Sequence, residues 1–123
     1  MKPTKYIDRV DKMFKHCKDR RLSRFGPDWD AFSGGINRER QAQENESRGP
    51  ERRIWQMCLV YWFEASDLLE MIHDGSSRNG LRAKALKKKK DLLRLKKKII
   101  AGKVDAAVGT KGLIGLMARA QQA

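Results

Sequence analysis

The stretch IWQMCLVYWFEASDLLEMI, residues 54–72, decides the fold because its apolar residues recur at helical spacing. Members of the main stripe are three or four positions apart, which places them on one face of an α-helix. A second stripe lies beside the first, so the apolar arc is wide. The two stripes consist of Ile54, Cys58, Tyr61, Ala65, Leu68 and Ile72, and of Trp55, Leu59, Trp62 and Leu69. The sequence therefore predicts a core helix over 51–73, with Pro50 at its start and Gly75 beyond its end.

The segment before this helix divides into one predicted helix and one predicted connection. Apolar residues at spacings of four, three and four, starting from Tyr6, predict a helix over 4–22 with Thr4 as its cap. Gly26, Pro27 and a Ser-Gly-Gly run then predict a break. We expect residues 26–49 to form a loop and a polar linker, with the linker around 36–49.

The segment after the core helix predicts a third helix of a different kind, over 81–101. Its apolar residues come in adjacent pairs seven positions apart, with Lys89 and Lys96 midway between the pairs. Such spacing predicts a narrow buried seam and not a full coiled-coil face. The pairs are Ala85–Leu86, Leu92–Leu93 and Ile99–Ile100. A short C-terminal helix is expected over 110–121.

The fold class that follows is all-α, one small domain of three to four helices over residues 1–123. A chain of 123 residues suits one modest domain. The apolar arc of 54–72 is wider than one neighbouring helix covers, which favours a homodimer in which a second copy buries the excess.

The net charge of +13 is concentrated in two blocks. Residues 1–25 carry a balance of +6 and residues 81–103 a balance of +10, whereas the segment between them is neutral to acidic. A surplus of this size repels itself in a compact fold, and it is typical of proteins with a polyanionic partner. Nucleic acid, an anionic membrane and an acidic protein are the candidates.

The lysine-rich run of the predicted third helix is the main functional signal. It holds ten bases and one acid in seventeen residues, and eight of the ten are lysines. Lysine is a compact point charge that suits phosphates, whereas arginine also reads base edges. The run predicts non-sequence-specific binding to a phosphate backbone. Its members are Arg82, Lys84, Lys87, Lys88, Lys89, Lys90, Arg94, Lys96, Lys97 and Lys98.

A second basic group lies at the end of the predicted first helix and just beyond it, and it consists of Lys15, Lys18, Arg20, Arg21 and Arg24. The last four of these are the predicted secondary contacts. Two basic helices together can straddle the phosphate rows of an A-form duplex by shape, which favours RNA over DNA. In composition alone the chain is similar to small viral RNA-binding and packaging proteins. No motif accompanies that likeness, so it assigns no role to any residue.

The sequence offers no pattern for catalysis, metal or cofactor. Cys17 and Cys58 lie far apart, and with His16 and His73 they lack the short paired spacing of zinc sites. No glycine-rich phosphate loop follows a strand, and no nucleophile has a recognisable base partner. We therefore expect a binding protein and not an enzyme, with core cysteines and with the aromatics of 55–63 packed inside.

Two other functions remain open at this stage. The lysine run can serve as a nuclear localisation signal recognised by an import receptor, in a helical adaptor whose apolar face at 54–72 binds another protein. Alternatively, the basic helix and the apolar tail around Leu113 to Met117 can lie on an anionic membrane, although the lysines of that helix point in most directions. No secretion signal opens the sequence, so the expected location is intracellular, in the nucleus or the cytoplasm.

Overall fold

The computed structural model describes residues 1–75 and 79–104, with side chains placed for all of them except 74, 75 and 79–82. This part of the chain is all-α, which confirms the predicted fold class. It contains four helices: α1 (Pro3–Asp19), α2 (Pro27–Glu46), α3 (Pro50–Gly75) and α4 (Asn79–Ile100). The core helix predicted over 51–73 is α3, and the basic helix predicted over 81–101 is α4. The helix predicted over 110–121 lies outside the described residues.

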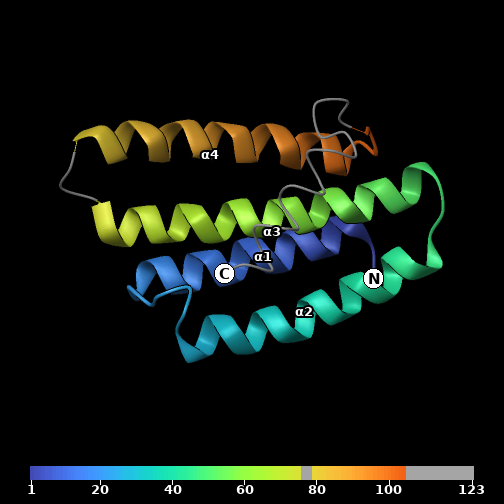
Figure 1. Ribbon diagram of the computed structural model, residues 1–123, viewed down its shortest axis with the longest axis horizontal. Coiled ribbons are helices and arrows are strands. Elements are labelled where there is room, and N and C mark those ends of the chain that lie inside the picture. The colour runs from blue at the N-terminus through green and yellow to red at the C-terminus, as the bar shows by residue number, and fades with distance from the viewer. Residues whose placement is uncertain (76–78, 105–123) are drawn as a thin grey trace.

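Successive helices run in opposite directions, because short connections can only return the chain alongside itself (Figure 1). α3 is the central element and packs against all three of the others. α1 packs against α2, α3 and α4, whereas α2 and α4 lie at opposite edges of the bundle. α4 therefore keeps an outer face that no described helix covers.

The apolar arc of α3 is wide because three helices share it. Its residues meet α1 through Tyr6 and Val10, α2 through Ile36, and α4 through Leu92, all buried in one core. At one end a smaller cluster adds Cys17, Trp29 and Leu69. Trp29 of α2 stacks on Trp62 of α3, with ring centroids 6.4 Å apart. Most of the wide apolar face at 54–72 is thus buried inside one chain. The homodimer and the adaptor role stay predictions.

Residues 26–49 are not a loop and linker, since 27–46 of them form α2. The helix begins at Pro27, whose missing N–H suits a first turn, and Asp28 and Asp30 lie near its positive end. Its inner face starts with the apolar residues Trp29 and Ile36. The prediction of a linker was wrong because that face continues with polar residues.

The polar residues that continue the inner face of α2 are buried as an ion pair. Arg40 and Glu44 are almost fully buried, and the Arg40 Nη1 donates to Glu44 Oε1 at 2.8 Å. The same nitrogen donates to the Trp55 carbonyl oxygen of α3 at 2.9 Å. Two opposite charges one helical turn apart neutralise each other, so this segment packs where hydropathy alone predicts exposure.

α1 departs from its prediction at both ends. Lys2 occupies the cap position and Pro3 the first turn, so Thr4 lies inside the helix and does not cap it. The helix ends at Asp19, and Arg21 follows with a left-handed φ of 55°. Residues 20–26 therefore form the connection to α2, and three of the four predicted bases of this region lie in it.

Candidate nucleic-acid interface

α4 is attached to the bundle by a single edge. Leu92, Leu95 and Ile99 are buried against the core, and Ala85 packs beside them. Only one member of each predicted pair takes part. The other members, Leu86, Leu93 and Ile100, are exposed by 60%, 53% and 51%. Leu95, which lies outside the pairs, completes the buried edge because it follows Leu92 by three positions.

Two lysines of α4 are used to hold the helix in place. Lys88 Nζ lies 2.8 Å from Glu64 Oε2 and 3.3 Å from Asp67 Oδ2 of α3. Lys96 Nζ lies 2.7 Å from Asp11 Oδ2 of α1, and the Tyr61 hydroxyl donates to the other oxygen of that carboxylate. Both lysines were predicted to contact phosphate, but the structure places them in ion pairs within the fold.

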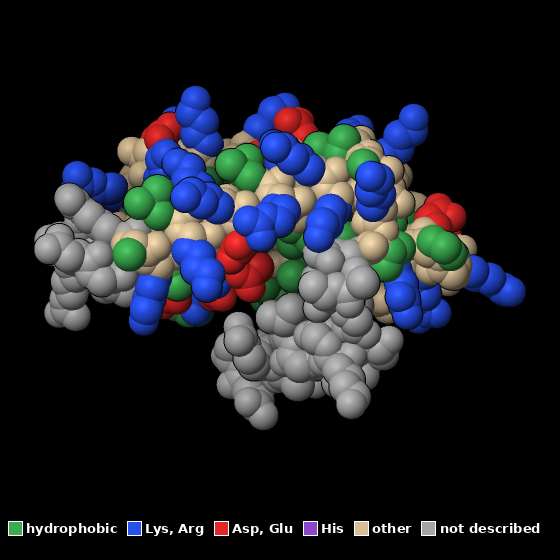
Figure 2. All heavy atoms as spheres, turned by 90° about the horizontal axis from the view of Figure 1, so that it is seen from above, with side chains coloured by type: hydrophobic (Ala, Val, Ile, Leu, Met, Phe, Trp, Pro, Cys, Tyr) green, Lys and Arg blue, Asp and Glu red, His purple; other side chains and the backbone are tan. Residues whose placement is uncertain are grey.

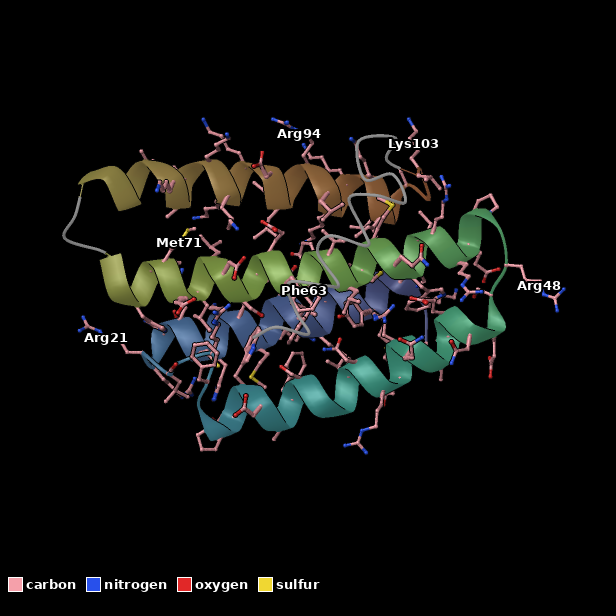
Figure 3. All side chains as sticks on the ribbon, in the orientation of Figure 1. Arg21, Arg48, Phe63, Met71, Arg94 and Lys103 are labelled. Atoms are coloured by element: carbon pink, nitrogen blue, oxygen red, sulfur yellow. The ribbon has the colours of Figure 1, made fainter. Side chains whose placement is uncertain are left out.

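Four of the other bases of α4 lie in a row on its outer face. Lys87, Lys90, Arg94 and Lys97 are spaced three, four and three positions apart and are all exposed. We call these four residues the outer ridge. They span about 15 Å at 1.5 Å per residue. Figure 2 shows Lys and Arg side chains along the whole length of this face, and Arg94 points away from the bundle in Figure 3.

The other predicted bases of α4 surround the ridge. Lys84 and Lys89 are exposed on its two flanks, and Lys98 is half-buried. Arg82 belongs to α4, but its side chain lies outside the described residues. The ridge and its flanks thus bring six of the ten predicted α4 bases to the surface as one field of positive charge.

The second predicted group divides in the same way. Lys18, Arg20 and Arg21 are exposed where α1 ends, and Arg21 lies at that end of the bundle in Figure 3. Arg24 is instead held by carboxylates of α3: its Nη1 lies 2.8 Å from Asp67 Oδ1, and its Nη2 lies 2.7 Å from Glu70 Oε2. Arg24 is therefore an anchor of the α1–α2 connection.

Ion pairs place the two basic groups on neighbouring surfaces. Asp67 accepts from both Arg24 and Lys88, so the α1–α2 connection and α4 meet on one carboxylate. On the other flank, the contact between Lys96 and Asp11 fixes the register of α4 against α1. These two helices are antiparallel in Figure 1.

The cysteines are separate from this surface. Cys17 and Cys58 are buried free thiols. Burial raises the pKa of Cys58 to about 12, although the nearby Arg40 acts in the opposite direction. Burial likewise raises the pKa of Tyr6 and Tyr61, and the contact with Asp11 adds to the effect at Tyr61. These groups stay neutral near pH 7 and belong to the core.

The sequence interpretation missed two exposed apolar features. One is the line of Leu86, Leu93 and Ile100 beside the outer ridge. Their spacing of seven residues was recognised, but they were predicted to lie in the buried seam together with their pair partners. The other is Phe25, exposed by 64% in the α1–α2 connection. The Arg24 guanidinium lies 4.4 Å from the centroid of its ring. Loop aromatics give no periodic signal, so the sequence alone does not distinguish Phe25 from the core aromatics.

No protein-family model, curated protein or solved structure matches the chain. Across residues 1–75 and 79–104, no helix is both long and apolar enough to cross a membrane. In the same residues no three His, Cys, Asp or Glu side chains are grouped as metal ligands would be.

Proposed function

We propose that the protein binds the phosphate backbone of nucleic acid without sequence specificity, and that RNA is its preferred polymer. The observation that carries this proposal is the outer ridge, four exposed bases on one face of a helix that is attached by its opposite edge. Phosphate neutralisation by such a row releases counterions from the polymer, which favours binding at low salt.

The neighbouring groups extend the same surface. Lys89 and Lys84 flank the ridge, and Lys18, Arg20 and Arg21 add charge at the end of α1. Like charges that lie close together repel in the free protein and gain from a bound anion. Bases on two helices suit the two phosphate rows of an A-form duplex, which is the reason for preferring RNA.

The test is a salt titration of binding with a charge-matched control. One variant replaces Lys87, Lys90, Arg94 and Lys97 by alanine. The control replaces four exposed bases elsewhere, Lys5, Arg38, Arg48 and Arg52; Arg48 lies at the opposite end of the bundle from Arg21 in Figure 3. Both variants lose the same net charge, so any difference between them reports position.

We expect the parent to bind labelled duplex RNA more tightly than duplex DNA, with an affinity that falls steeply with salt. The slope of log K against log salt is negative, and the ridge variant should reduce its magnitude by about 3, whereas the control should reduce it by less than about 1. Equal losses in both variants would contradict the assignment to the ridge. No binding by the parent at low salt would contradict the function.

A second candidate function is favoured by one observation, the exposed line of Leu86, Leu93 and Ile100 beside the ridge. An apolar line next to lysines suits the surface of an anionic bilayer. The same titration distinguishes the two functions when vesicles containing phosphatidylserine replace RNA. Flotation of the protein with these vesicles, together with weak RNA binding, would indicate that the outer ridge binds a membrane and not RNA.

A further inference from the structure

The connection between α1 and α2 contains a serine that follows two arginines. The sequence there reads Arg20-Arg21-Leu22-Ser23. Arginine-directed protein kinases recognise a serine with arginines two and three positions before it, because carboxylates of the kinase pair with the planar guanidinium groups. No other serine or threonine of the chain has arginines at both of these positions. The motif therefore singles out Ser23 as a candidate site of phosphorylation.

The structure places this motif at the surface. Arg20, Arg21 and Ser23 are exposed, and Leu22 is half-buried. The Ser23 Oγ accepts a hydrogen bond from the Phe25 backbone N–H at 3.1 Å, in an exposed turn. Among the other serines whose side chains the structure describes, Ser47 and Ser66 are buried and Ser33 is half-buried. Sequence motif and exposure thus select the same serine.

A kinase binds its substrate segment in an extended form, so the connection must open before it reacts. Two backbone hydrogen bonds close it onto the end of α1, from Arg21 N–H to the Lys18 oxygen at 3.3 Å and from Leu22 N–H to the Cys17 oxygen at 2.8 Å. Arg21 also has a left-handed φ of 55°, which is unfavourable for a residue other than glycine. Extension relieves this conformation, and a connection opens at a fraction of the free energy of global unfolding.

The reaction transfers the terminal phosphoryl group of ATP to Ser23. The Ser23 Oγ attacks the γ-phosphorus, and the bond between that phosphorus and the oxygen that bridges it to ADP breaks. ADP leaves with the electron pair of the broken bond, and the hydroxyl proton passes to a base of the kinase. The product carries about two negative charges at pH 7.

Arg24 follows Ser23 but is not free to neutralise this charge. Its guanidinium is paired with two carboxylates of α3, at 2.8 Å from Asp67 Oδ1 and 2.7 Å from Glu70 Oε2. Ser23 and Glu70 line the same cavity of about 180 Å³. The Glu70 carboxylate repels a phosphate from the inner part of that cavity. We therefore expect the phosphate to turn outward.

On the outer side, the phosphate meets the exposed bases at the end of α1. Arg21 lines the same cavity as Ser23, and Arg20 and Lys18 lie next to it along the chain and are exposed as well. About two negative charges among these three bases offset most of their positive charge. The outer ridge on α4 keeps its four bases.

We propose that Ser23 is a phosphorylation site for an arginine-directed kinase, and that a phosphate on Ser23 lowers the affinity of the protein for nucleic acid. The second part rests on the proposed function, since the bases at the end of α1 must contact the polymer. Because the outer ridge is unchanged, phosphorylation weakens binding without abolishing it.

The experiment incubates the full chain with ATP and the catalytic subunit of cyclic-AMP-dependent protein kinase. Peptide mass spectrometry locates and counts the phosphates, and Ser23→Ala removes the proposed acceptor. The double variant Arg20→Lys with Arg21→Lys keeps the charge but loses both guanidinium groups. Arg48→Lys with Arg52→Lys is the matched control, and Arg48 lies at the opposite end of the bundle from Arg21 in Figure 3.

We expect one phosphate per chain, on Ser23, and none on Ser23→Ala. The initial rate of phosphorylation should fall about tenfold in the Arg20 and Arg21 double variant and stay unchanged in the control. The phosphorylated parent should bind duplex RNA about tenfold more weakly than the untreated parent at about 0.1 M salt. Ser23→Ala taken through the same incubation should bind as before, and circular dichroism checks that the helical content is retained.

The outcomes separate the modification from the function. No phosphate on Ser23, or equal rates in the two double variants, would overturn the site while nucleic-acid binding stands. Complete phosphorylation of Ser23 with unchanged RNA affinity would overturn the effect on binding. A parent that binds no polymer would overturn the proposed function, and mass spectrometry would still decide whether Ser23 is the site.

Discussion

α2 and α4 are both rich in charged residues, yet the fold uses their charges in opposite ways. α2 carries five acids and two bases, and it buries one of each as the pair of Arg40 and Glu44. α4 carries ten bases and one acid. A helix with both signs can neutralise itself in the interior, whereas a helix of one sign cannot.

The lysines at the packed edge of α4 are therefore paired with acids of neighbouring helices. Asp11 of α1 and Glu64 and Asp67 of α3 hold two of its lysines at the edge where it joins the bundle. Among residues 1–75 and 79–104, no acid of another helix is paired with Lys87, Lys90, Arg94 or Lys97, and these four are the bases that we propose for a polyanion. The following three predictions test whether charges that hold the fold differ from the charges proposed for binding.

The largest effect is expected in α2, from Arg40→Ala. The change leaves Glu44 buried without its partner and removes the donor to the Trp55 carbonyl, so we expect a loss of about 3–5 kcal/mol in the free energy of unfolding. Urea denaturation measures it.

Two further variants make this prediction specific. Arg38→Ala, on the exposed face of the same helix, should stay within about 0.5 kcal/mol of the parent. The double variant Arg40→Met with Glu44→Leu should recover most of the loss, because it buries no charge. If Arg40→Ala unfolds at nearly the same urea concentration as the parent, the pair does not stabilise α2.

The buried pair also explains what the sequence could and could not predict. Helices α1, α3 and α4 follow from apolar periodicity, because most of the buried residues on their inner faces are hydrophobic. In α2 the inner face runs from Trp29 and Ile36 into Arg40 and Glu44, and hydropathy does not reveal that two opposite charges will share one buried site. The helix was therefore missed although Pro27 and the first-turn acids signal its start.

The candidate surface was predictable in position and not in detail. Composition locates the basic run on α4 and the second group near the end of α1. Which lysines bind within the fold depends on acids distant in sequence, such as Asp11 and Asp67, and no local pattern contains that information. Phe25 was overlooked for a related reason, since its exposure depends on how the α1–α2 connection packs on α3.

The next effect contrasts two leucines of α4. Leu95 is 8% exposed and Leu93 is 53% exposed. Leu95→Ala removes buried methyl groups and leaves a cavity, so we expect a loss of about 2–4 kcal/mol. Leu93→Ala should cost less than about 0.5 kcal/mol. Thermal unfolding of both variants measures the contrast, and equal losses would mean that α4 packs through a different edge.

The smallest change in stability is expected from substitutions of two adjacent lysines, Lys87 and Lys88. Comparing these two variants separates an effect on stability from an effect on RNA binding. Lys88→Met removes the ion pairs to Glu64 and Asp67, which are partly exposed, so we expect a loss of about 1 kcal/mol in stability and little change in RNA affinity. Lys87→Met should leave stability unchanged and reduce the magnitude of the negative salt slope of RNA binding by about 1. Methionine keeps the length of each side chain, so the variants differ from the parent mainly in charge. If the two variants lose the same affinity for RNA, the ion pairs of Lys88 do not exclude it from the interface. Lys87 and Lys88 would then both contact the polymer, and the distinction between a lysine that holds the fold and a lysine that binds RNA would be wrong.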